Sequence, residues 1–340
     1  MKRNRSLVAL LALIVIGALA LAGLAAASSK KESLNGAGST FVAQLVAQWT
    51  AHYAAASINY SAVGSGAGIS QITARTVDFG ASDAPMSPDQ FSACHGCVQI
   101  PWAFSATSIP YNVSGVGYGL KLTGPVLSNI YLGHITKWND KRIRAINPGV
   151  KLPDESIVPI FRSDGSGTSF NFTDYLSHAS KEWKSRIGKS TQPAFPAGVG
   201  ARGSSGVAAK LQSTPGGITY VDIGYSYKFH FKIAKIRNRA GNFILPRATS
   251  VAAVSAQVKK VPKNNAISVV DPTRKVKNGY PICTFTWVIV PLQTPKAAAL
   301  KSFIDWAVTK GQSYGRPLLF LRLPKVVTRA ARTTTAKLHA

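Results

Sequence analysis

The sequence predicts an α/β protein of about two domains, and three observations carry this prediction. Short apolar runs such as Val77–Ala81 alternate with stretches of helical periodicity such as Phe41–Tyr53. Turns rich in glycine and serine join the two kinds of segment, as expected where strands and helices alternate. The chain has 340 residues, of which 46% are hydrophobic and 16% charged, so it is not generally disordered and can bury a large core.

Each element follows from the spacing of its apolar residues. Phe41, Leu45, Trp49 and Tyr53 recur every four residues and predict an amphipathic helix. The other predicted helices are a short one ending at Thr73, Leu127–Tyr131, Trp138–Asn147, Ser169–His178, Gly203–Leu211 and Ala297–Thr309. The predicted strands or extended segments are Ile58–Val63, Val77–Ala81, Ile100–Asn112, Val158–Phe161, Ile218–Val221 and Thr284–Val290. The basic tail from Arg316 is expected to be partly disordered at its end.

Residues 1–27 predict export from the cytoplasm. Lys2, Arg3 and Arg5 precede an apolar run of 21 residues, Leu7–Ala27, which ends in small residues before Ser28. The run is longer than the ~7–15 residues of a signal peptide's apolar region and close to the ~20 of a spanning helix. Cleavage as a signal and retention as an uncleaved anchor therefore both stay open. In either case residues 28–340 are expected outside the cytoplasm, in the periplasm or at the cell surface.

Cys94 and Cys97 lie in one of the predicted loops with two residues between them. In an oxidising compartment a local disulfide that pins the loop is the simplest interpretation. A redox-active pair has the same spacing but lacks a thioredoxin-like strand–helix setting. A zinc site needs further ligands that the sequence does not place, so no metal is predicted. Cys283 lies in an apolar strand and is expected to be buried.

Three turns that open helices are the most informative feature, and they are Gly38-Ser39-Thr40, Gly64-Ser65-Gly66 and Gly165-Ser166-Gly167-Thr168. A helix N-terminus presents unpaired N–H groups and the positive end of a dipole. Glycines let an anion approach the backbone, and hydroxyls add donors. Helix capping explains one such turn alone. Three of them, with Arg162 just before the third, indicate one convergent site for a small oxyanion.

Asp83 adds a carboxylate to this set of donors. A carboxylate beside a bound anion is repulsive unless the anion carries a proton that it can donate. Phosphate carries one at neutral pH and sulfate does not, so an acceptor at this position favours phosphate over sulfate. Taken alone, Asp83 would more simply cap its turn.

Five long motifs follow one another along the chain. They are Gly36–Phe41, Gly64–Gly68, Val77–Pro85, Ile130–Gly133 with Thr136–Asp140, and Arg162–Thr168. In this order they strongly resemble the phosphate-binding proteins of the bacterial high-affinity phosphate ABC importer. The resemblance runs from about Leu34 to Tyr220 and resumes over Tyr280–Trp306. The basic segment 225–278 and the loop of Cys94 and Cys97 depart from the family's pattern.

The resemblance implies a two-lobed periplasmic-binding-protein fold of type II. Two chain crossings between the lobes would fall near Phe104 and near Ile282. Lobe one would consist of residues 33–104 plus 282–340, and lobe two of residues 105–281. The ligand would lie in the cleft at the carboxyl ends of the strands.

The same resemblance implies the residues that bind phosphate. The donors would be the Thr40 hydroxyl and amide, the Phe41 N–H, the Ser65 hydroxyl, and Ser166, Gly167 and Thr168 at the third helix start. Asp83 would accept the phosphate proton. Arg162 would be the charge partner, oriented by Asp164 from behind.

The resemblance also implies the protein's role and partners. The chain would be a monomeric receptor for inorganic phosphate that docks on the membrane subunits of an ABC permease driven by a cytoplasmic ATPase. It would need no cofactor and would not be an enzyme. A receptor for another tetrahedral oxyanion is the alternative closest to this interpretation.

Two other classes of function compete with a receptor. In a hydrolase, Ser166 would be the nucleophile, but residues 164 and 168 break the Gly-x-Ser-x-Gly pattern, and His178 is misplaced for a base. A polyanion-binding protein is suggested by the formal charge of +27 and by twelve Lys and Arg against one acid over residues 225–277. Outside the cytoplasm its target would be an anionic membrane or envelope polymer, not nucleic acid, since the basic residues lack the aromatic interleaving that is typical of base stacking.

Overall fold

The computed structural model describes residues 31–340. The predicted signal or anchor at residues 1–27 lies outside the described residues. Within residues 31–340, no helix has the length and apolar character that crossing a membrane would require.

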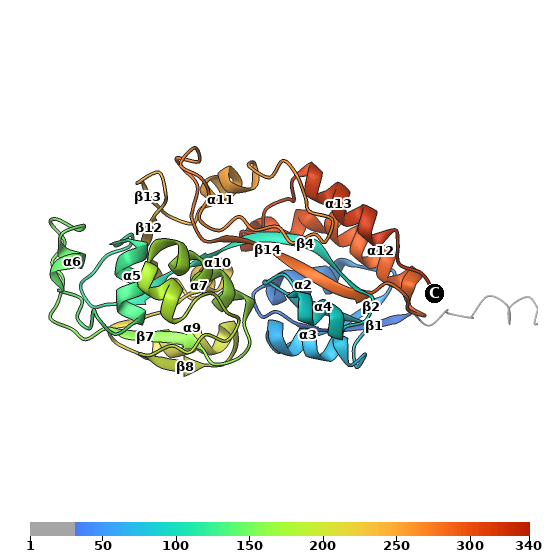
Figure 1. Cartoon of the computed structure of the whole chain (residues 1–340), viewed down its shortest axis with the longest axis horizontal. Coiled ribbons are helices and arrows are strands. Elements are labelled where there is room, and N and C mark those ends of the chain that lie inside the picture. Colours follow the sequence, from blue (N-terminus) through green and yellow to red (C-terminus); the bar gives the residue numbers. More distant parts are fainter. Residues whose placement is uncertain (1–30) are drawn as a thin grey trace, which may run out of the picture. The chain divides into compact units, whose positions relative to one another are not determined.

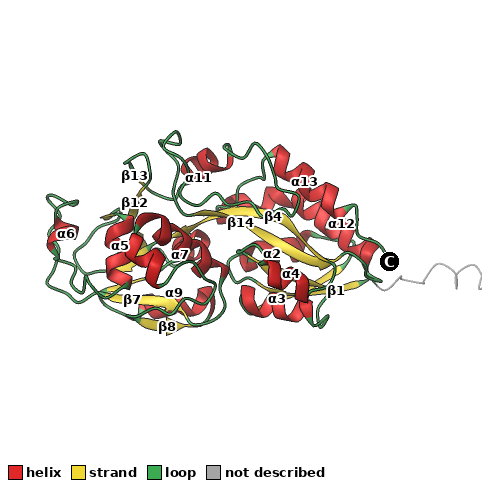
Figure 2. Cartoon of the chain, viewed as in Figure 1, coloured by secondary structure: helices red, strands yellow, loops and turns green. Residues whose placement is uncertain are grey.

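Two main sheets organise residues 33–340, and they lie side by side with helices around each (Figures 1 and 2). The first has six strands in the order β10-β4-β14-β3-β1-β2. We call it and its helices lobe one. Its strands are β1 (Ser33–Gly38), β2 (Ser57–Ala62), β3 (Phe79–Ser82), β4 (Cys97–Ser108), β10 (Val221–Asp222) and β14 (Cys283–Pro291). Its helices are α2 (Ala43–His52), α3 (Ser65–Thr73), α4 (Pro88–Ala93), α12 (Ala297–Val308), the 3-10 segment η1 (Lys310–Leu318) and α13 (Lys325–Thr335).

The second main sheet has five strands in the order β11-β5-β9-β7-β8, and we call it and its helices lobe two. Its strands are β5 (Pro110–Asn112), β7 (Val158–Arg162), β8 (Val199–Ala201), β9 (Gly217–Ile218) and β11 (Lys232–Ile233). A small sheet adds β6 (Lys121–Leu122), β12 (Lys235–Arg237) and β13 (Phe243–Ile244). The helices are α5 (Gly124–Tyr131), α6 (Lys141–Arg144), α7 (Gly167–Ala179), α8 (Lys181–Arg186), α9 (Gly203–Gln212), α10 (Ile223–Lys228) and, in the basic segment, α11 (Ala248–Ser255).

In each main sheet, parallel pairing brings the carboxyl ends of neighbouring strands to the same edge. In lobe one β1 pairs in parallel with β2 and with β3, and in lobe two β7 pairs in parallel with β8 and β9. The carboxyl ends of β1 and β3 therefore lie at one edge of their sheet, as expected for open α/β sheets that bind ligands there.

Large aromatic side chains fill the core of lobe one. Trp49 from α2 packs against Trp102 from β4 with ring centroids 5.0 Å apart, and Phe79 and Phe303 close the cluster. All four side chains are fully buried. The apolar periodicity that predicts helix α2 is thus explained by one face that packs into this cluster.

The prediction of one strand over Ile218–Val221 is wrong, because the segment divides between the sheets. Ile218 pairs with Tyr111 of β5, whereas Val221 pairs with Ser108 of β4. The strands β4 and β5 belong to different sheets. The segment Ile218–Val221 runs antiparallel to both, so it passes from the sheet of β5 to the sheet of β4. An apolar run shows burial, but it does not show which sheet buries it.

Two other expectations are corrected. The tail is ordered: α13 is amphipathic, and its Val327 and Ala331 are fully buried in the core of lobe one. The predicted helix Trp138–Asn147 shrinks to α6, because the Asp140 side chain accepts the Arg142 N–H and caps the helix there. Trp138 lies before that cap and is held by its indole N–H on the Gly216 carbonyl at 3.0 Å.

Candidate functional site

The three helix-opening turns meet between the lobes. Ser65 shows this most directly, because its hydroxyl oxygen accepts the N–H of Gly167 at 3.1 Å and the N–H of Asp83 at 3.3 Å. Ser65 begins α3 in lobe one and Gly167 begins α7 in lobe two. Residues that are 102 positions apart in the sequence are therefore in direct hydrogen-bond contact.

Asp83 lies just beyond the end of β3 and is 1% exposed. Its carboxylate accepts hydrogen bonds from the hydroxyls of Ser39 at 2.5 Å and Ser65 at 3.5 Å. Burial raises the pKa of Asp83 to about 7, against the opposing effects of these hydroxyls and of the Arg162 charge. Near neutral pH this carboxyl can therefore either accept or hold a proton.

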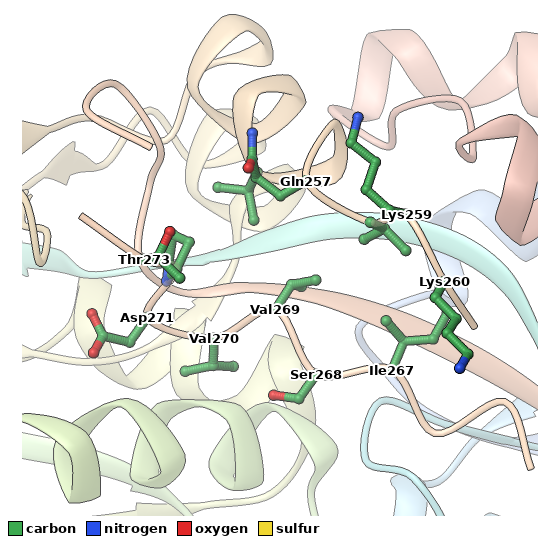
Figure 3. A pocket seen from close by; sticks show the side chains of 12 residues that line it. Gln257, Lys259, Lys260, Ile267, Ser268, Val269, Val270, Asp271 and Thr273 are labelled. Carbon is green, nitrogen blue, oxygen red and sulfur yellow. The ribbon is translucent and has the colours of Figure 1, made fainter. Parts of the chain in front are cut away.

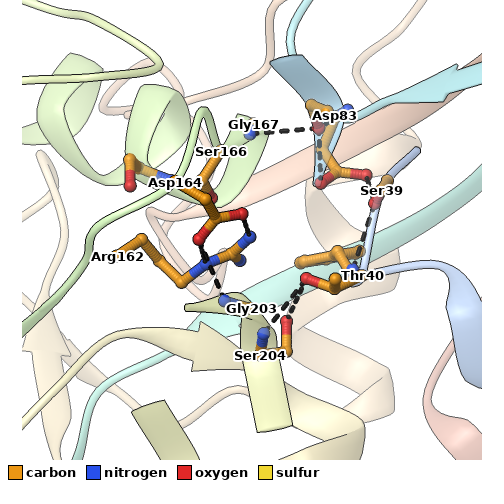
Figure 4. Close-up of polar contacts among 12 residues, drawn as sticks. Ser39, Thr40, Asp83, Arg162, Asp164, Ser166, Gly167, Gly203 and Ser204 are labelled. Atoms are coloured by element: carbon orange, nitrogen blue, oxygen red, sulfur yellow. Dashed lines mark hydrogen bonds and ion pairs between the residues drawn. The ribbon is translucent and has the colours of Figure 1, made fainter. Parts of the chain in front are cut away.

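Arg162 is the last residue of β7, and its guanidinium group is held by Asp164 (Figure 4). Its Nε and Nη2 donate to the two carboxylate oxygens of Asp164 at 2.7 and 2.5 Å. This bidentate pair occupies one edge of the guanidinium and leaves Nη1 without a bond to Asp164. Burial raises the pKa of Asp164, but Arg162 and the Gly203 N–H outweigh it and hold that pKa below its usual value. Asp164 therefore holds Arg162 in place, the contact that the family resemblance implied.

The start of α7 carries the third group of predicted donors. The Ser166 hydroxyl oxygen caps the helix by accepting the Ser169 N–H at 3.1 Å. The Thr168 hydroxyl is buried and has no hydrogen-bond partner in the described part of the chain. A buried hydroxyl without a partner is costly, so Thr168 is a group that a bound oxyanion would satisfy.

Thr40 joins the site through a contact between the lobes. Its hydroxyl oxygen lies 2.9 Å from the Ser204 hydroxyl and accepts the Ser204 N–H at 3.1 Å. Phe41 makes its contacts within and beside the first turn. Its N–H donates to the Ser39 hydroxyl at 3.1 Å, and its buried ring packs edge-on against Phe320. That its N–H binds an anion stays a prediction.

Glycines bring the two backbones together without intervening side chains. The Gly66 N–H donates to the Gly165 carbonyl at 2.9 Å. A Cβ on either glycine would lie 3.1 Å from the other's Cα, closer than most real contacts allow. A Cβ on Gly167 would fall 2.7 Å from the backbone of Asp83. The spacing of these turns thus depends on residues that have no side chain.

The structure adds three residues that the sequence analysis did not select. Ser39 holds the Asp83 carboxylate, and its place beside Thr40 in a selected turn was the signal for it. Ser204 lies in the first turn of α9, a turn-to-helix junction that was recognised but not assigned to the site. Asp222 is 1% exposed, and no pattern in the sequence indicates that it lies near the others.

Asp222 is a second buried carboxyl group near Asp83. One of its oxygens accepts the Tyr225 N–H at 3.2 Å, and the other has no partner within residues 31–340. Burial raises the pKa of Asp222 well above its usual range. The Tyr225 N–H opposes this rise and the charge of Asp83 adds to it. Asp222 therefore favours its neutral form in a site that already holds Asp83 and Asp164.

Other predicted features lie away from this site. Cys94 and Cys97 form a disulfide after α4, and Cys283 is buried and free. His178 faces Asp174 at 3.8 Å, not Ser166. Within residues 31–340, no cluster of three or more His, Cys, Asp or Glu side chains is placed to hold a metal ion. A pocket of about 530 Å³ lies in the basic segment (Figure 3), but its lining, which includes Lys259, Lys260 and Asp271, contains none of the predicted site residues.

Comparison with known proteins shows the family of this chain. A model of the PBP superfamily domain matches residues 25–310. The phosphate-binding protein PstS of Xylella fastidiosa strain Temecula1 is 38% identical over 88% of this chain and 84% of its own length. PstS3 of Mycobacterium bovis strain BCG is 35% identical over 83% of this chain and 80% of its own length. The chain belongs to the PstS family of phosphate-binding proteins.

Solved structures show that the PstS fold extends to more distant proteins. PfluDING, a high-affinity periplasmic phosphate-binding protein bound with phosphate, superposes with a TM-score of 0.71 at 22% identity, over 88% of this chain and 93% of its own. A putative phosphate ABC transporter substrate-binding protein from Clostridium perfringens, also with bound phosphate, gives a TM-score of 0.63 at 17% identity, over 86% and 100% of the two chains. The predicted two-lobed fold and the resemblance to the PstS family are therefore confirmed.

Proposed function

We propose that this chain is an extracytoplasmic receptor that captures inorganic phosphate between its lobes and delivers it to an ABC permease. The observation that carries the proposal is the junction at Ser65, which contacts Gly167 of lobe two and Asp83 of lobe one. The three turns that would each bind an anion weakly are thus close enough to bind one anion together. Membership of the PstS family supports the same ligand.

In this proposal the phosphate oxygens accept hydrogen bonds from donors of both lobes. Arg162 supplies the charge through the edge that Asp164 leaves free. The start of α7 supplies N–H groups and the unpartnered Thr168 hydroxyl. Thr40 and Ser65 supply hydroxyls from lobe one. Because these donors come from both lobes, a bound anion would hold the lobes together.

Asp83 supplies selectivity in this proposal. With a pKa near 7, it is matched to the second ionisation of phosphate, which lies in the same range. One proton shared between the carboxyl and a phosphate oxygen turns a repulsive contact into a hydrogen bond. Sulfate has no such proton near neutral pH, and it would meet a carboxylate with no hydrogen between them.

Several finer features are part of the proposal. By the family resemblance the chain would divide into residues 33–104 plus 282–340 and residues 105–281. In the structure the first change of sheet falls at Ile109, between β4 and β5, and β10 at Val221–Asp222 pairs back into the sheet of lobe one. Residues 1–27 would direct export, as a cleaved signal or a retained anchor. The loaded receptor would dock on permease subunits in the membrane, and binding itself needs neither a cofactor nor a chemical step.

Isothermal titration of phosphate-free residues 28–340 tests the proposal, first with phosphate and then with sulfate. We expect tight one-to-one binding of phosphate and no heat from sulfate. Equal or preferred binding of sulfate would assign the chain to another oxyanion. Failure to bind either ion would overturn the receptor proposal and favour the basic surface as the functional feature.

A further inference from the structure

Asn171 lies in the second turn of α7, between the start of that helix and lobe one. It is 4% exposed, and its side-chain nitrogen donates two hydrogen bonds. One goes to the Gly167 carbonyl on its own helix at 2.8 Å. The other goes to the main-chain carbonyl of Asp83 in lobe one at 2.7 Å. A single side chain thus joins the two backbones that carry the proposed acceptor and the proposed donors.

Both bonds require a group with two hydrogens on one atom. An amide nitrogen has them, whereas a serine or threonine hydroxyl has one and an ionised carboxylate has none. Thr284 also lies 3.4 Å from the Asp83 carbonyl, but its hydroxyl has a closer acceptor, the Phe285 carbonyl, at 2.7 Å. Asn171 is therefore the short donor to the Asp83 carbonyl.

The position is unfavourable for asparagine on local grounds. Asparagine is a poorer helix former than leucine or alanine, because its side chain competes for backbone hydrogen bonds. Phe172, its neighbour in the same helix, is fully buried, so apolar packing is available in this region. The structure offsets the unfavourable propensity with a bond that reaches the other lobe.

We propose that Asn171 is a positioning residue that sets the distance between the Asp83 carboxyl group and the N–H groups of α7. This inference rests on the proposed function and adds to it a residue that does not touch the anion. Gly167 lies directly against the Asp83 backbone, so a small displacement of Asp83 changes the width of the binding site. Loss of the bond would loosen the acceptor relative to the donors.

The test compares Asn171→Leu with wild type. Leucine has a similar volume but no donor, and it leaves the Asp83 carbonyl without its short bond. We expect phosphate affinity to fall on the order of tenfold, mainly through faster dissociation, because the bond exists only while the lobes are in contact. The ratio of phosphate affinity to sulfate affinity should also fall, which a merely structural defect would not produce.

Asn129→Leu is the matched control. Asn129 makes the same bond to the carbonyl four residues earlier in its helix, Pro125 at 2.7 Å, but it makes no hydrogen bond to lobe one. This variant should bind phosphate as wild type does. Asn171→Asp is a second, isosteric variant, and its ionised carboxylate would face two carbonyl oxygens. It should weaken phosphate binding at least as much as leucine does.

The outcomes separate this inference from the proposed function. If wild type binds neither phosphate nor sulfate, the proposed function fails. If wild type binds phosphate selectively and both Asn171 variants keep its affinity, dissociation rate and selectivity, the positioning role of Asn171 is overturned. Thermal unfolding of each variant checks that the fold is retained, and the aspartate variant decides the matter if the leucine variant does not fold.

Discussion

The Ser39 hydroxyl donates to the Asp83 carboxylate over 2.5 Å, from the turn that follows β1 to the end of β3. The same oxygen accepts the N–H groups of Phe41 and Val42 at 3.1 and 3.3 Å. Ser39 therefore links the conformation of the first helix-opening turn to the orientation of the buried Asp83 carboxyl group. We expect Asp83 to depend on this contact for its position and for its proton affinity.

Replacement of Ser39 by alanine should weaken phosphate binding while the fold persists. The variant loses a charge-assisted hydrogen bond to Asp83, worth about 1.5–3 kcal/mol in the folded protein. The carboxyl group is then held less firmly, so phosphate should bind more weakly. It should also raise the pKa of Asp83, because the Ser39 bond lowers that pKa. Titration calorimetry at several pH values measures both effects. Ser87→Ala, which removes a cap of α4 away from the site, should leave binding unchanged.

Asp83→Asn should reduce discrimination against sulfate. An amide can donate to an unprotonated oxyanion, so sulfate no longer meets a carboxylate, and phosphate loses its proton acceptor. Competition of sulfate against phosphate in calorimetry gives the ratio of the two affinities. Asp78→Asn is a control, because Asp78 pairs with Lys296 just before β3 and outside the site. A ratio unchanged in Asp83→Asn would contradict the role of the carboxyl group.

Arg162→Ala should cost more affinity than any hydroxyl variant. Arg162 and Asp164 have side chains that are 2% and 10% exposed, so alanine removes the charge partner and leaves Asp164 unpaired. We expect a loss of at least about 3 kcal/mol, or roughly 150-fold. Arg142 forms the same two-residue pair with Asp140 at the surface, with 40% and 21% exposure. Arg142→Ala should therefore bind phosphate normally, and tight binding by Arg162→Ala would show that another cation holds the anion.

The stability of the phosphate-free protein should fall as the pH rises from about 4 to about 7. Asp83 titrates near 3.9 when unfolded and near 7 when folded, so the folded state binds more protons over that interval. One pKa unit corresponds to about 1.4 kcal/mol, so the loss is a few kcal/mol. Asp222, whose pKa burial also raises, contributes a slope of the same sign.

Urea unfolding at pH 5 and pH 7.5 measures this slope. Asp83→Asn should have a smaller slope than wild type, because its amide does not titrate. Asp89→Asn, at an exposed site in α4, should keep the wild-type slope. Equal slopes in wild type and Asp83→Asn would show that Asp83 titrates alike in the folded and unfolded states.

The basic surface should raise the association rate of phosphate and leave its dissociation rate nearly unchanged. Outside the predicted signal or anchor the formal charge is still +24, since residues 1–27 contribute Lys2, Arg3 and Arg5 to the total of +27. Electrostatic attraction of this kind raises association rates and is screened by salt. Stopped-flow kinetics should show an association rate that falls with ionic strength and a nearly constant dissociation rate. Tight, salt-sensitive binding to anionic vesicles would instead indicate a polyanion-binding surface.

Much of this site could be predicted because its chemistry is local. A glycine and a hydroxyl residue at a helix start have the same meaning wherever the helix lies, so Ser65, Ser166 and Gly167 could be selected from neighbouring residues alone. Arg162 and Asp164 are two positions apart in the sequence, and their pairing was expected from the family resemblance. The resemblance to the PstS family then placed these groups in one site.

The residues that were missed have partners far along the chain. Ser204 contacts Thr40 across 164 positions, and Asn171 contacts Asp83 across 88. Asp222 reaches the site because Ile218–Val221 divides between the two sheets, which an apolar run does not reveal. Contacts of this kind depend on how the two lobes pack against each other, and a residue pattern within one segment cannot predict that packing.

The contact between Gly66 and Gly165 limits which substitutions are compatible with contact between the lobes. Two main chains touch there, so even a methyl group at either position would act as a spacer between the lobes. An alanine would not disturb either lobe's core, since neither glycine is a core residue, yet it would push the two main chains apart by a few tenths of an ångström. We expect such a variant to fold and to hold its ligand less tightly, a defect that measurements of stability alone would overlook.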